Sequence, residues 1–189
     1  MKRTEICGNI ASGKTTLCQN LFNIDRLPIY EKFQDNPFYK AFYLNPSAYS
    51  FETELTFLLQ HYHSIKESSS VPHLVCDYSL LLDMAYADVN LTENRHRIFF
   101  EVVLELLHEI GHPQTIIHLT CPEEILLDRI IARSRSAETS ITLDYLKAIS
   151  EALSKRVNSI SSKTKVITIK SDLVDFRMGI DCIPELKRL

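Results

Sequence analysis

Short apolar runs alternate along this chain with segments in which apolar residues recur at helical spacing. The apolar runs predict five strands, over residues 4–7, 28–31, 73–77, 114–120 and 165–169. The last three runs are apolar or β-branched on both faces, which is typical of strands buried in a parallel sheet. The clearest helical stripe covers residues 92–110, and Pro122 and Thr142 are placed to begin two further helices. The alternation predicts an α/β fold, a parallel sheet with helices on both faces.

Aromatic residues are concentrated in one part of this pattern. Eight of the 17 phenylalanine and tyrosine residues fall between residues 30 and 51, together with two Asn-Pro steps that favour turns. Two interpretations are open. The rings either pack a helix and a loop onto the sheet, or they form the wall of a pocket for a flat ligand.

The segment at residues 8–16 carries the most specific chemical signal. Gly8, four further residues, and then Gly13, Lys14 and Thr15 have the spacing of a P-loop, after an apolar run and before a helical segment. Glycine permits the tight backbone that an anion-binding loop needs, and two of the four glycines of the chain lie here. In such a loop the backbone N–H groups surround phosphates, the lysine reaches the β- and γ-phosphates, and the hydroxyl binds Mg²⁺. We expect ATP to bind through Gly8, Asn9, Ile10, Ala11, Ser12, Gly13, Lys14, Thr15 and Thr16.

Composition excludes several classes of function. The 189 residues, 45% hydrophobic and 24% charged, are typical of a soluble globular protein, and we expect one domain over 1–189. A net charge of -3 does not resemble the basic surface of a nucleic-acid binder, and no apolar run is long enough to span a membrane. No signal peptide precedes the first predicted strand, and we expect a cytoplasmic protein. Free thiols in a reducing compartment are expected, because no C-x-x-C pair occurs among Cys7, Cys18, Cys76, Cys121 and Cys182.

Two acids and three arginines are candidates for phosphoryl-transfer chemistry. Glu31 and Asp77 lie at the ends of predicted strands, where α/β proteins gather their sites, although either acid also suits a helix cap. Arg129 and Arg133 share a helix face at i, i+4, and Arg135 follows in a polar stretch. These arginines indicate either a mobile cationic lid over about 129–141 or a solvated basic face.

The chain resembles the deoxynucleoside kinase family, which covers deoxycytidine, deoxyadenosine and deoxyguanosine kinases and mitochondrial-type thymidine kinase. The resemblance runs from residue 6 to about residue 176. It rests on the order and spacing, after the P-loop, of YEKFQDNPFYKAFY, YSFETELTFLLQHY, DYSLLLD, RIIARSRSAE and LDYL. It implies a P-loop kinase fold with a five-stranded parallel sheet and a short arginine-bearing lid. It also implies a homodimer packed through helices such as 92–110, although that apolar stripe is equally well explained as core.

The resemblance implies the catalytic residues by position. Glu31 matches the glutamate that acts as general base on the nucleoside 5′-OH, and Asp77 matches an acid near Mg²⁺, beside Thr15. The lid arginines that close on the ATP phosphates match Arg129, Arg133 and Arg135.

The resemblance also implies the residues that hold the nucleoside. Tyr43 and Glu138 match the pair that binds the deoxyribose 3′-OH. His61 and Asp83 fall where the family places residues that contact the edge of the base. Taken alone, the histidines suggest no metal site, because His61 and His63 are two apart on a probable helix and point in different directions.

The sequence departs from the family pattern in three places. Tyr78 stands where an arginine usually supports the phosphates. Lys32 and Phe33 follow Glu31 where Pro-Val is common, and Glu54 stands where a glutamine usually contacts the base. These departures bear on the identity of the substrate and on efficiency, and leave the P-loop intact.

Glu54 carries a prediction about the base. An ionised carboxylate only accepts hydrogen bonds, and guanine presents two adjacent donors on its Watson–Crick edge. An ionised Glu54 therefore predicts a purine substrate, with deoxyguanosine favoured over deoxyadenosine. Burial can instead keep Glu54 neutral, in which case it resembles glutamine or pairs with His61.

These observations predict a kinase that uses ATP and Mg²⁺ to phosphorylate the 5′-OH of a deoxynucleoside, with a purine as the base. A first alternative is another small-molecule P-loop kinase, with a nucleotide or vitamin substrate. A phosphorylated acceptor needs a second cationic pocket, for which residues 30–60 supply only Lys32 and Lys40. A second alternative is a nucleotide-binding module without catalysis, supported only by Tyr78.

Overall fold

Five parallel strands form the centre of the computed structural model, which describes residues 2–22, 25–160, 162–179 and 183–186. The strands are β1 (Lys2–Gly8), β2 (Leu27–Ile29), β3 (His73–Cys76), β4 (Thr115–Thr120) and β5 (Lys165–Lys170). Their order in the sheet is β2-β3-β1-β4-β5, and every pairing is parallel. The central position of β1 puts the loop that follows it at the middle of one edge of the sheet.

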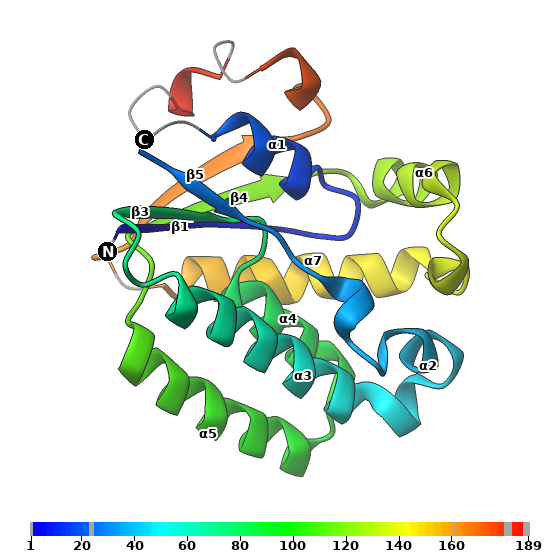
Figure 1. Cartoon of the computed structure of the whole chain (residues 1–189). Helices are drawn as coiled ribbons and strands as arrows, with labels where there is room; N and C mark the ends of the chain where they lie inside the picture. The colour runs from blue at the N-terminus through cyan, green and yellow to red at the C-terminus, as the bar shows by residue number, and fades with distance from the viewer. Residues whose placement is uncertain (1, 23–24, 161, 180–182, 187–189) are drawn as a thin grey trace.

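Helices cover both faces of this sheet, as the sequence predicts. They are α1 (Lys14–Asn20), α2 (Tyr39–Leu44), α3 (Pro46–Glu67), α4 (Leu80–Asn90), α5 (Glu93–Ile110), α6 (Glu123–Arg133) and α7 (Leu143–Asn158). In Figure 1, α1 and the 3₁₀ turns Phe176–Met178 and Pro184–Leu186 lie on one face, and α4 and α7 on the other, with α3 and α5 packed outside α4. Among the described residues, none of the helices has the length and apolar character to cross a membrane.

The apolar stripe of α5 is used within the fold. Phe99 and Val103 are buried against α3 and α4, and Leu104 on the opposite side is exposed. Gly111 ends the helix at a positive φ of 69°, as its position in the sequence predicts.

The expectation that β5 is buried on both faces is wrong. Its residues alternate between exposed and buried, with Ile167 and Ile169 facing the core and Val166 and Thr168 facing outward. The reason is its place at the edge of the sheet, where one face lacks a covering helix. The other strands agree with the prediction to within two residues, and Cys182 lies outside the described residues.

A buried ion pair ties β1 to two helix ends. The Arg3 guanidinium lies 2.8 Å from Glu5 Oε1 and donates to the carbonyls of Ile110 and Gly111 at the end of α5. The other oxygen of Glu5 accepts hydrogen bonds from the Ser79 hydroxyl and the Leu80 N–H at the start of α4. Glu5 thereby fixes the turn between β3 and α4.

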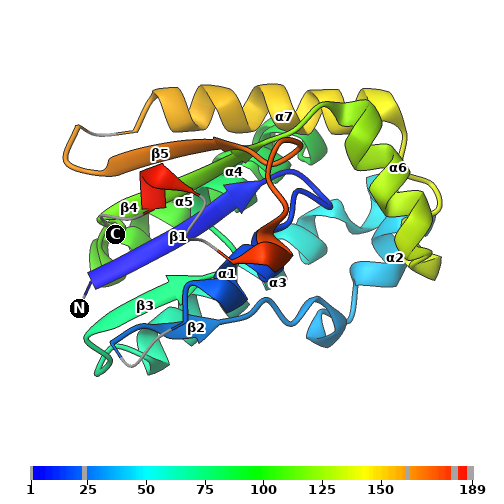
Figure 2. The same ribbon diagram turned by 90° about the horizontal axis from the view of Figure 1, so that it is seen from above.

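The carboxyl ends of the parallel strands all reach the same edge of the sheet. Figure 2 shows α2 and α6 beyond this edge, together with the loop after β1. The residues that follow β1, β2 and β3 therefore meet there, and they include Lys14, Glu31 and Asp77.

Substitution of Glu5 by alanine should strongly destabilise the fold. Removing one partner of a buried pair leaves the Arg3 charge uncompensated, which typically lowers the free energy of unfolding by about 3–5 kcal/mol. Urea denaturation of Glu5→Ala measures this loss. The matched control is Glu101→Ala, which removes the exposed pair with Arg97 on α5 and should change stability by less than about 1 kcal/mol. Equal effects of the two variants would contradict this role for Glu5.

Candidate active site

The loop between β1 and α1 has the backbone of an anion-binding turn. Ala11 and Gly13 both adopt the left-handed conformation, with φ of 62° and 97°. A Cβ on Gly13 would meet the Phe176 ring at 3.0 Å, and a Cβ on Gly8 would lie 2.8 Å from the Leu119 carbonyl oxygen. Gly8 is therefore required by close approach and Gly13 by its left-handed backbone, and such residues turn N–H groups toward one concave side.

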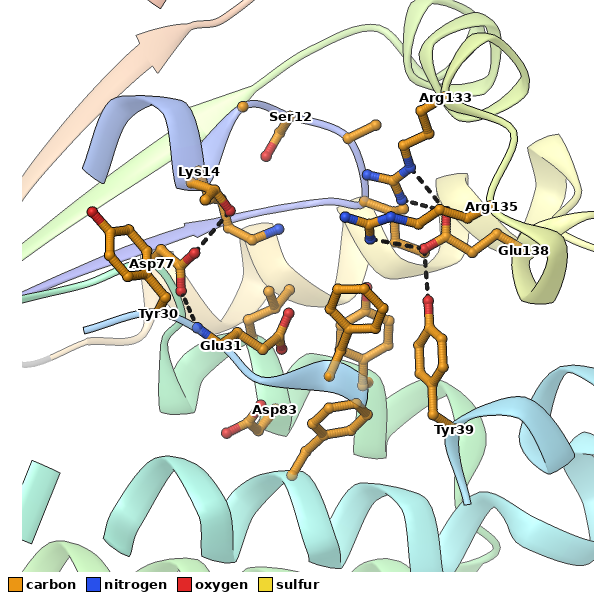
Figure 3. A pocket seen from close by; sticks show the side chains of 18 of the residues that line it. Ser12, Lys14, Tyr30, Glu31, Tyr39, Asp77, Asp83, Arg133, Arg135 and Glu138 are labelled. Carbon is orange, nitrogen blue, oxygen red and sulfur yellow. Dashed lines mark hydrogen bonds and ion pairs between the residues drawn. The ribbon is translucent and has the colours of Figure 1, made fainter. Parts of the chain in front are cut away.

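Asp77 joins the ends of three strands through its carboxylate. Its Oδ2 accepts a hydrogen bond of 2.7 Å from the Thr15 hydroxyl in the first turn of α1, and its Oδ1 accepts one of 2.5 Å from the Glu31 N–H after β2 (Figure 3). Burial raises the pKa of Asp77, although these two hydrogen bonds act in the opposite direction. The Lys14 ammonium lies in the same region and donates to the carbonyls of Gly8 and Asn9.

A cavity of about 470 Å³ opens beside these groups, within the usual size range for small-molecule sites. Its wall takes in residues 10–13 of the loop, residues 14–16 at the start of α1 and five of the clustered aromatic residues. Those rings also pack on one another, for example Tyr39 on Tyr43 at 5.3 Å between centroids, so both interpretations of the cluster hold. The remaining lining residues from the predicted set are Glu31, Glu54, Asp77, Asp83, Arg129, Arg133, Arg135 and Glu138. Gly8, Asn9 and His61 lie outside this lining.

Glu138 lies at the centre of the polar segment for which the sequence predicts a lid. It follows α6 in a 3₁₀ turn (Ser136–Glu138) and is buried although it is charged. Its carboxylate forms ion pairs with Arg133 and Arg135 and accepts a 2.7 Å hydrogen bond from the Tyr39 hydroxyl. Tyr39 belongs to the aromatic cluster, but the sequence does not predict its contact with Glu138; its i, i+4 spacing from Tyr43 on α2 places both rings on one helix face.

Arg129 has different partners from the other two arginines. Its guanidinium donates to the Ala11 carbonyl of the loop and to the Ser171 carbonyl after β5. In this structure Arg129 therefore ties α6 to the loop, while Arg133 and Arg135 hold Glu138.

His61 on α3 lies behind the cavity wall, between two carboxylates. Its Nδ1 is 2.8 Å from Asp83 Oδ2, and its Nε2 is 3.4 Å from Glu31 Oε1. Burial by itself lowers the pKa of His61, but the charge of Asp83 with its hydrogen bond, together with the nearby Glu31 carboxylate, outweighs burial and raises that pKa to about 10. Burial raises the pKa of Glu31, but His61, Lys14 and Arg135 together lower it below its ordinary value. His63 is exposed, so the two histidines do point in different directions.

Comparison with known proteins decides the family. The family model for deoxynucleoside kinase matches residues 5–183. The chain belongs to the deoxynucleoside kinase family. It is therefore a kinase whose acceptor is a deoxynucleoside, and the family implies ATP as the donor.

Curated relatives and solved structures agree with this family. The chain is 28% identical to a deoxyguanosine kinase of Bacillus subtilis over 89% of this chain and 86% of the relative. It is 28% identical to a deoxyadenosine kinase of Dictyostelium discoideum, over 90% and 73% respectively. A deoxyadenosine kinase from M. mycoides with bound dATP has the same fold, with a TM-score of 0.82 at 17% identity over 96% of both chains. The predicted family and the predicted five-stranded α/β fold are confirmed.

Two residues that depart from the family pattern lie around His61 and the cavity of this kinase. Tyr78, at the position of the missing arginine, is buried and stacks on His61 with 4.0 Å between ring centroids and 8° between planes. Glu54 is buried on α3, on the same helix face as Phe57 and His61. It accepts a 2.8 Å hydrogen bond from the Asn90 amide. Sequence reasoning missed Asn90, because nothing in the pattern of α4 marks its last residue as a partner of α3.

Burial raises the pKa of Glu54 to about 8, and the nearby charges of Asp83 and Glu31 add to this effect, while the Asn90 hydrogen bond opposes it. The expectation of an ionised Glu54 is therefore not favoured near neutral pH. The neutral state offers one donor and one acceptor, as glutamine does.

Glu54→Gln should make the protein more stable than wild type, and the difference in the free energy of unfolding should grow as pH rises. In the unfolded chain the carboxyl has a pKa near about 4.3, whereas the folded state keeps its proton up to about pH 8. Wild type therefore loses stability as pH rises between those values, and the glutamine variant does not. Urea denaturation should show similar stabilities near pH 4 and an advantage for the variant that grows by about 1 kcal/mol per pH unit and reaches several kcal/mol near pH 8.

The control for this measurement is Glu105→Gln, at an exposed position on α5. Its difference from wild type should stay constant over the same pH range. A constant difference for Glu54→Gln as well would show that Glu54 is ionised in the folded protein.

Proposed function

We propose that this kinase transfers the γ-phosphoryl group of ATP to the 5′-OH of a purine 2′-deoxynucleoside. The observation that carries the proposal is the meeting of Lys14, Glu31 and Asp77 at one end of a cavity whose other end is walled by aromatic rings. The first three residues supply phosphate-binding charge, a base and a metal ligand. The rings offer flat apolar surfaces against which a nucleobase can stack.

The phosphate end of the cavity suits ATP with Mg²⁺. The ion prefers oxygen ligands and is commonly held by one or two carboxylates together with substrate phosphates. The Thr15 hydroxyl and the Asp77 carboxylate lie 2.7 Å apart and would hold it. The loop N–H groups and Lys14 would bind the phosphates, and Arg129, Arg133 and Arg135 would offset the charge of the transferring group.

Glu31 would act as the general base. As the 5′-oxygen forms its bond to the γ-phosphorus and the bond to ADP breaks, the hydroxyl proton passes to the Glu31 carboxylate. A base must be ionised to accept that proton, and the lowered pKa of Glu31 supports this role.

The other end of the cavity would hold the nucleoside. Tyr43 and Glu138, with Tyr39 beside them, would bind the 3′-OH, and Glu54 and Asp83 would contact the base. The deoxyguanosine and deoxyadenosine kinases among the relatives support a purine. A pKa of about 8 puts both protonation states of Glu54 within reach, so the proposal covers deoxyguanosine and deoxyadenosine alike.

The alternative of a monophosphate acceptor lacks support in the geometry. Lys32 and Lys40 are exposed, and neither belongs to the lining of the cavity. A second phosphate would meet the aromatic wall.

The resemblance to the family supports one further proposal, and the cysteine residues support another. The first is a homodimer packed partly through α5, where Leu104 is 68% exposed. The second is a cytoplasmic location, which suits the free thiols of Cys7, Cys18, Cys76 and Cys121.

Glu31→Gln should lower kcat by about 10²-fold or more with little change in nucleoside Kd, because the amide cannot accept a proton while its shape is retained. A coupled assay of ATP consumption measures kcat, and calorimetry measures Kd. The control is Asp35→Asn, an exposed acid four residues away, which should leave both unchanged.

An unchanged kcat in Glu31→Gln would refute the assignment of the base. A rise in Kd alone would make Glu31 a binding residue, and Asp77 would then be the better candidate base.

A 2′,3′-dideoxynucleoside should be a poor substrate. A site built around a hydroxyl leaves its own polar groups without that partner when the hydroxyl is missing. Here the Tyr39 hydroxyl already donates a hydrogen bond to Glu138, so we expect a moderate loss in kcat/KM of about 10–100-fold. Steady-state kinetics with the deoxy and dideoxy forms of one base measure the ratio. Equal values of kcat/KM would remove Tyr43 and Glu138 from the site.

A further inference from the structure

The contact between His61 and Glu31 is the main support for the orientation of the Glu31 side chain. Glu31 follows β2 in backbone without regular structure, and its N–H is held by Asp77. The Oε1 atom of its carboxylate lies 3.4 Å from His61 Nε2. His61 Nε2 is buried, and that nitrogen has no hydrogen bond of normal geometry within the part of the chain that the structure describes. A buried donor without a bond therefore faces a carboxylate slightly beyond bonding distance.

The imidazole ring itself is held firmly. Asp83 on α4 contacts Nδ1 at 2.8 Å, which fixes how the ring is turned. Tyr78 stacks on the ring almost in parallel, and Phe57 stacks nearby at 5.9 Å and 28°. Aromatic faces attract a cationic ring, so this setting suits an imidazolium.

We propose that His61 is a positioning residue that bridges Asp83 and Glu31 as an imidazolium and thereby orients the Glu31 carboxylate for catalysis. The proposal rests on the proposed role of Glu31 as the general base. With one carboxylate oxygen directed at Nε2, the other oxygen is left for the 5′-OH. Catalytic hydrogen bonds are often long in empty sites and shorten when the substrate binds.

The other cations near Glu31 cannot take over this task. Lys14 and Arg135 are also close enough to Glu31 to interact with its charge, but both line the cavity, where the donor phosphates would attract them. His61 lies outside the lining and has only carboxylates as charged partners among the described residues, Asp83 from α4 and Glu31 from the segment after β2. It is therefore the cation that remains with the base when the phosphates are bound.

Two substitutions of His61 separate this role from binding of the base. The amide nitrogen of glutamine can reach the position of Nε2, whereas that of asparagine reaches only the position of Nδ1. A misplacement of about 1 Å at a reacting group can cost about 10²-fold in rate, so His61→Asn should lower kcat by roughly 10–100-fold. His61→Gln should restore the contact with Glu31 without the charge and keep a kcat several-fold above that of His61→Asn. The KM for the nucleoside should stay near the wild-type value in both variants.

His63→Gln is the matched control, because His63 lies two residues away on α3 with its side chain exposed and paired with Glu67. It should leave kcat and KM unchanged. Thermal melting of the variants shows whether they fold. A measurement on the wild-type protein does not depend on variants: ring ¹⁵N NMR at pH 7.5 should find both nitrogens of His61 protonated.

Three results would overturn the inference. The first is a neutral His61 ring in the wild-type spectrum. The second is an equal loss of kcat in both variants, and the third is a rise in KM without a loss of kcat, which would place His61 among the groups that bind the base. The Glu31→Gln variant separates this inference from the proposal beneath it. If that variant keeps its kcat, the base assignment fails, and if it loses turnover while the two His61 variants behave alike, only the role of His61 fails.

Discussion

The carboxylate of Asp77 is the interaction on which the geometry of the site depends. One oxygen accepts a hydrogen bond from the Thr15 hydroxyl, and the other accepts one from the N–H of Glu31. Because β3 lies between β1 and β2, a short side chain at its end can reach the residues that follow both neighbours. The phosphate-binding loop and the proposed base therefore take their relative positions from Asp77. The turn that begins at Asp77 is in turn fixed by Glu5 of the Arg3–Glu5 pair.

Charge balance explains how so many acids lie around one cavity. Glu138 is paired with Arg133 and Arg135, Asp83 with His61, and Glu31 with His61 beside Lys14. Glu54 has the Asn90 amide as its hydrogen-bond donor, and its pKa is raised accordingly. In the proposed reaction the ATP phosphates compete with Glu138 for the same guanidinium groups. Binding of the donor would thereby free Glu138 for the sugar.

The sequence predicts what depends on neighbouring residues and fails where distant ones meet. The loop at residues 8–16 and the strand positions follow from local spacing, and the parallel sheet then brings Glu31 and Asp77 together. Tyr39 and Glu138 are 99 residues apart, and Asn90 meets Glu54 across two helices, so no local pattern marks either contact. β5 contains the same kinds of residues as a central strand, and only its place at the edge of the sheet exposes one face.

The most direct test of the central claim is a competition among substrates. The purified kinase is given ATP, Mg²⁺ and an equimolar mixture of the four deoxynucleosides, and mass spectrometry with 5′-phosphate standards identifies the products over time. The account predicts that the 5′-monophosphates of deoxyguanosine and deoxyadenosine form first, and that none forms without ATP. Faster phosphorylation of a pyrimidine would contradict the purine assignment, and the absence of any 5′-monophosphate would contradict the proposed reaction.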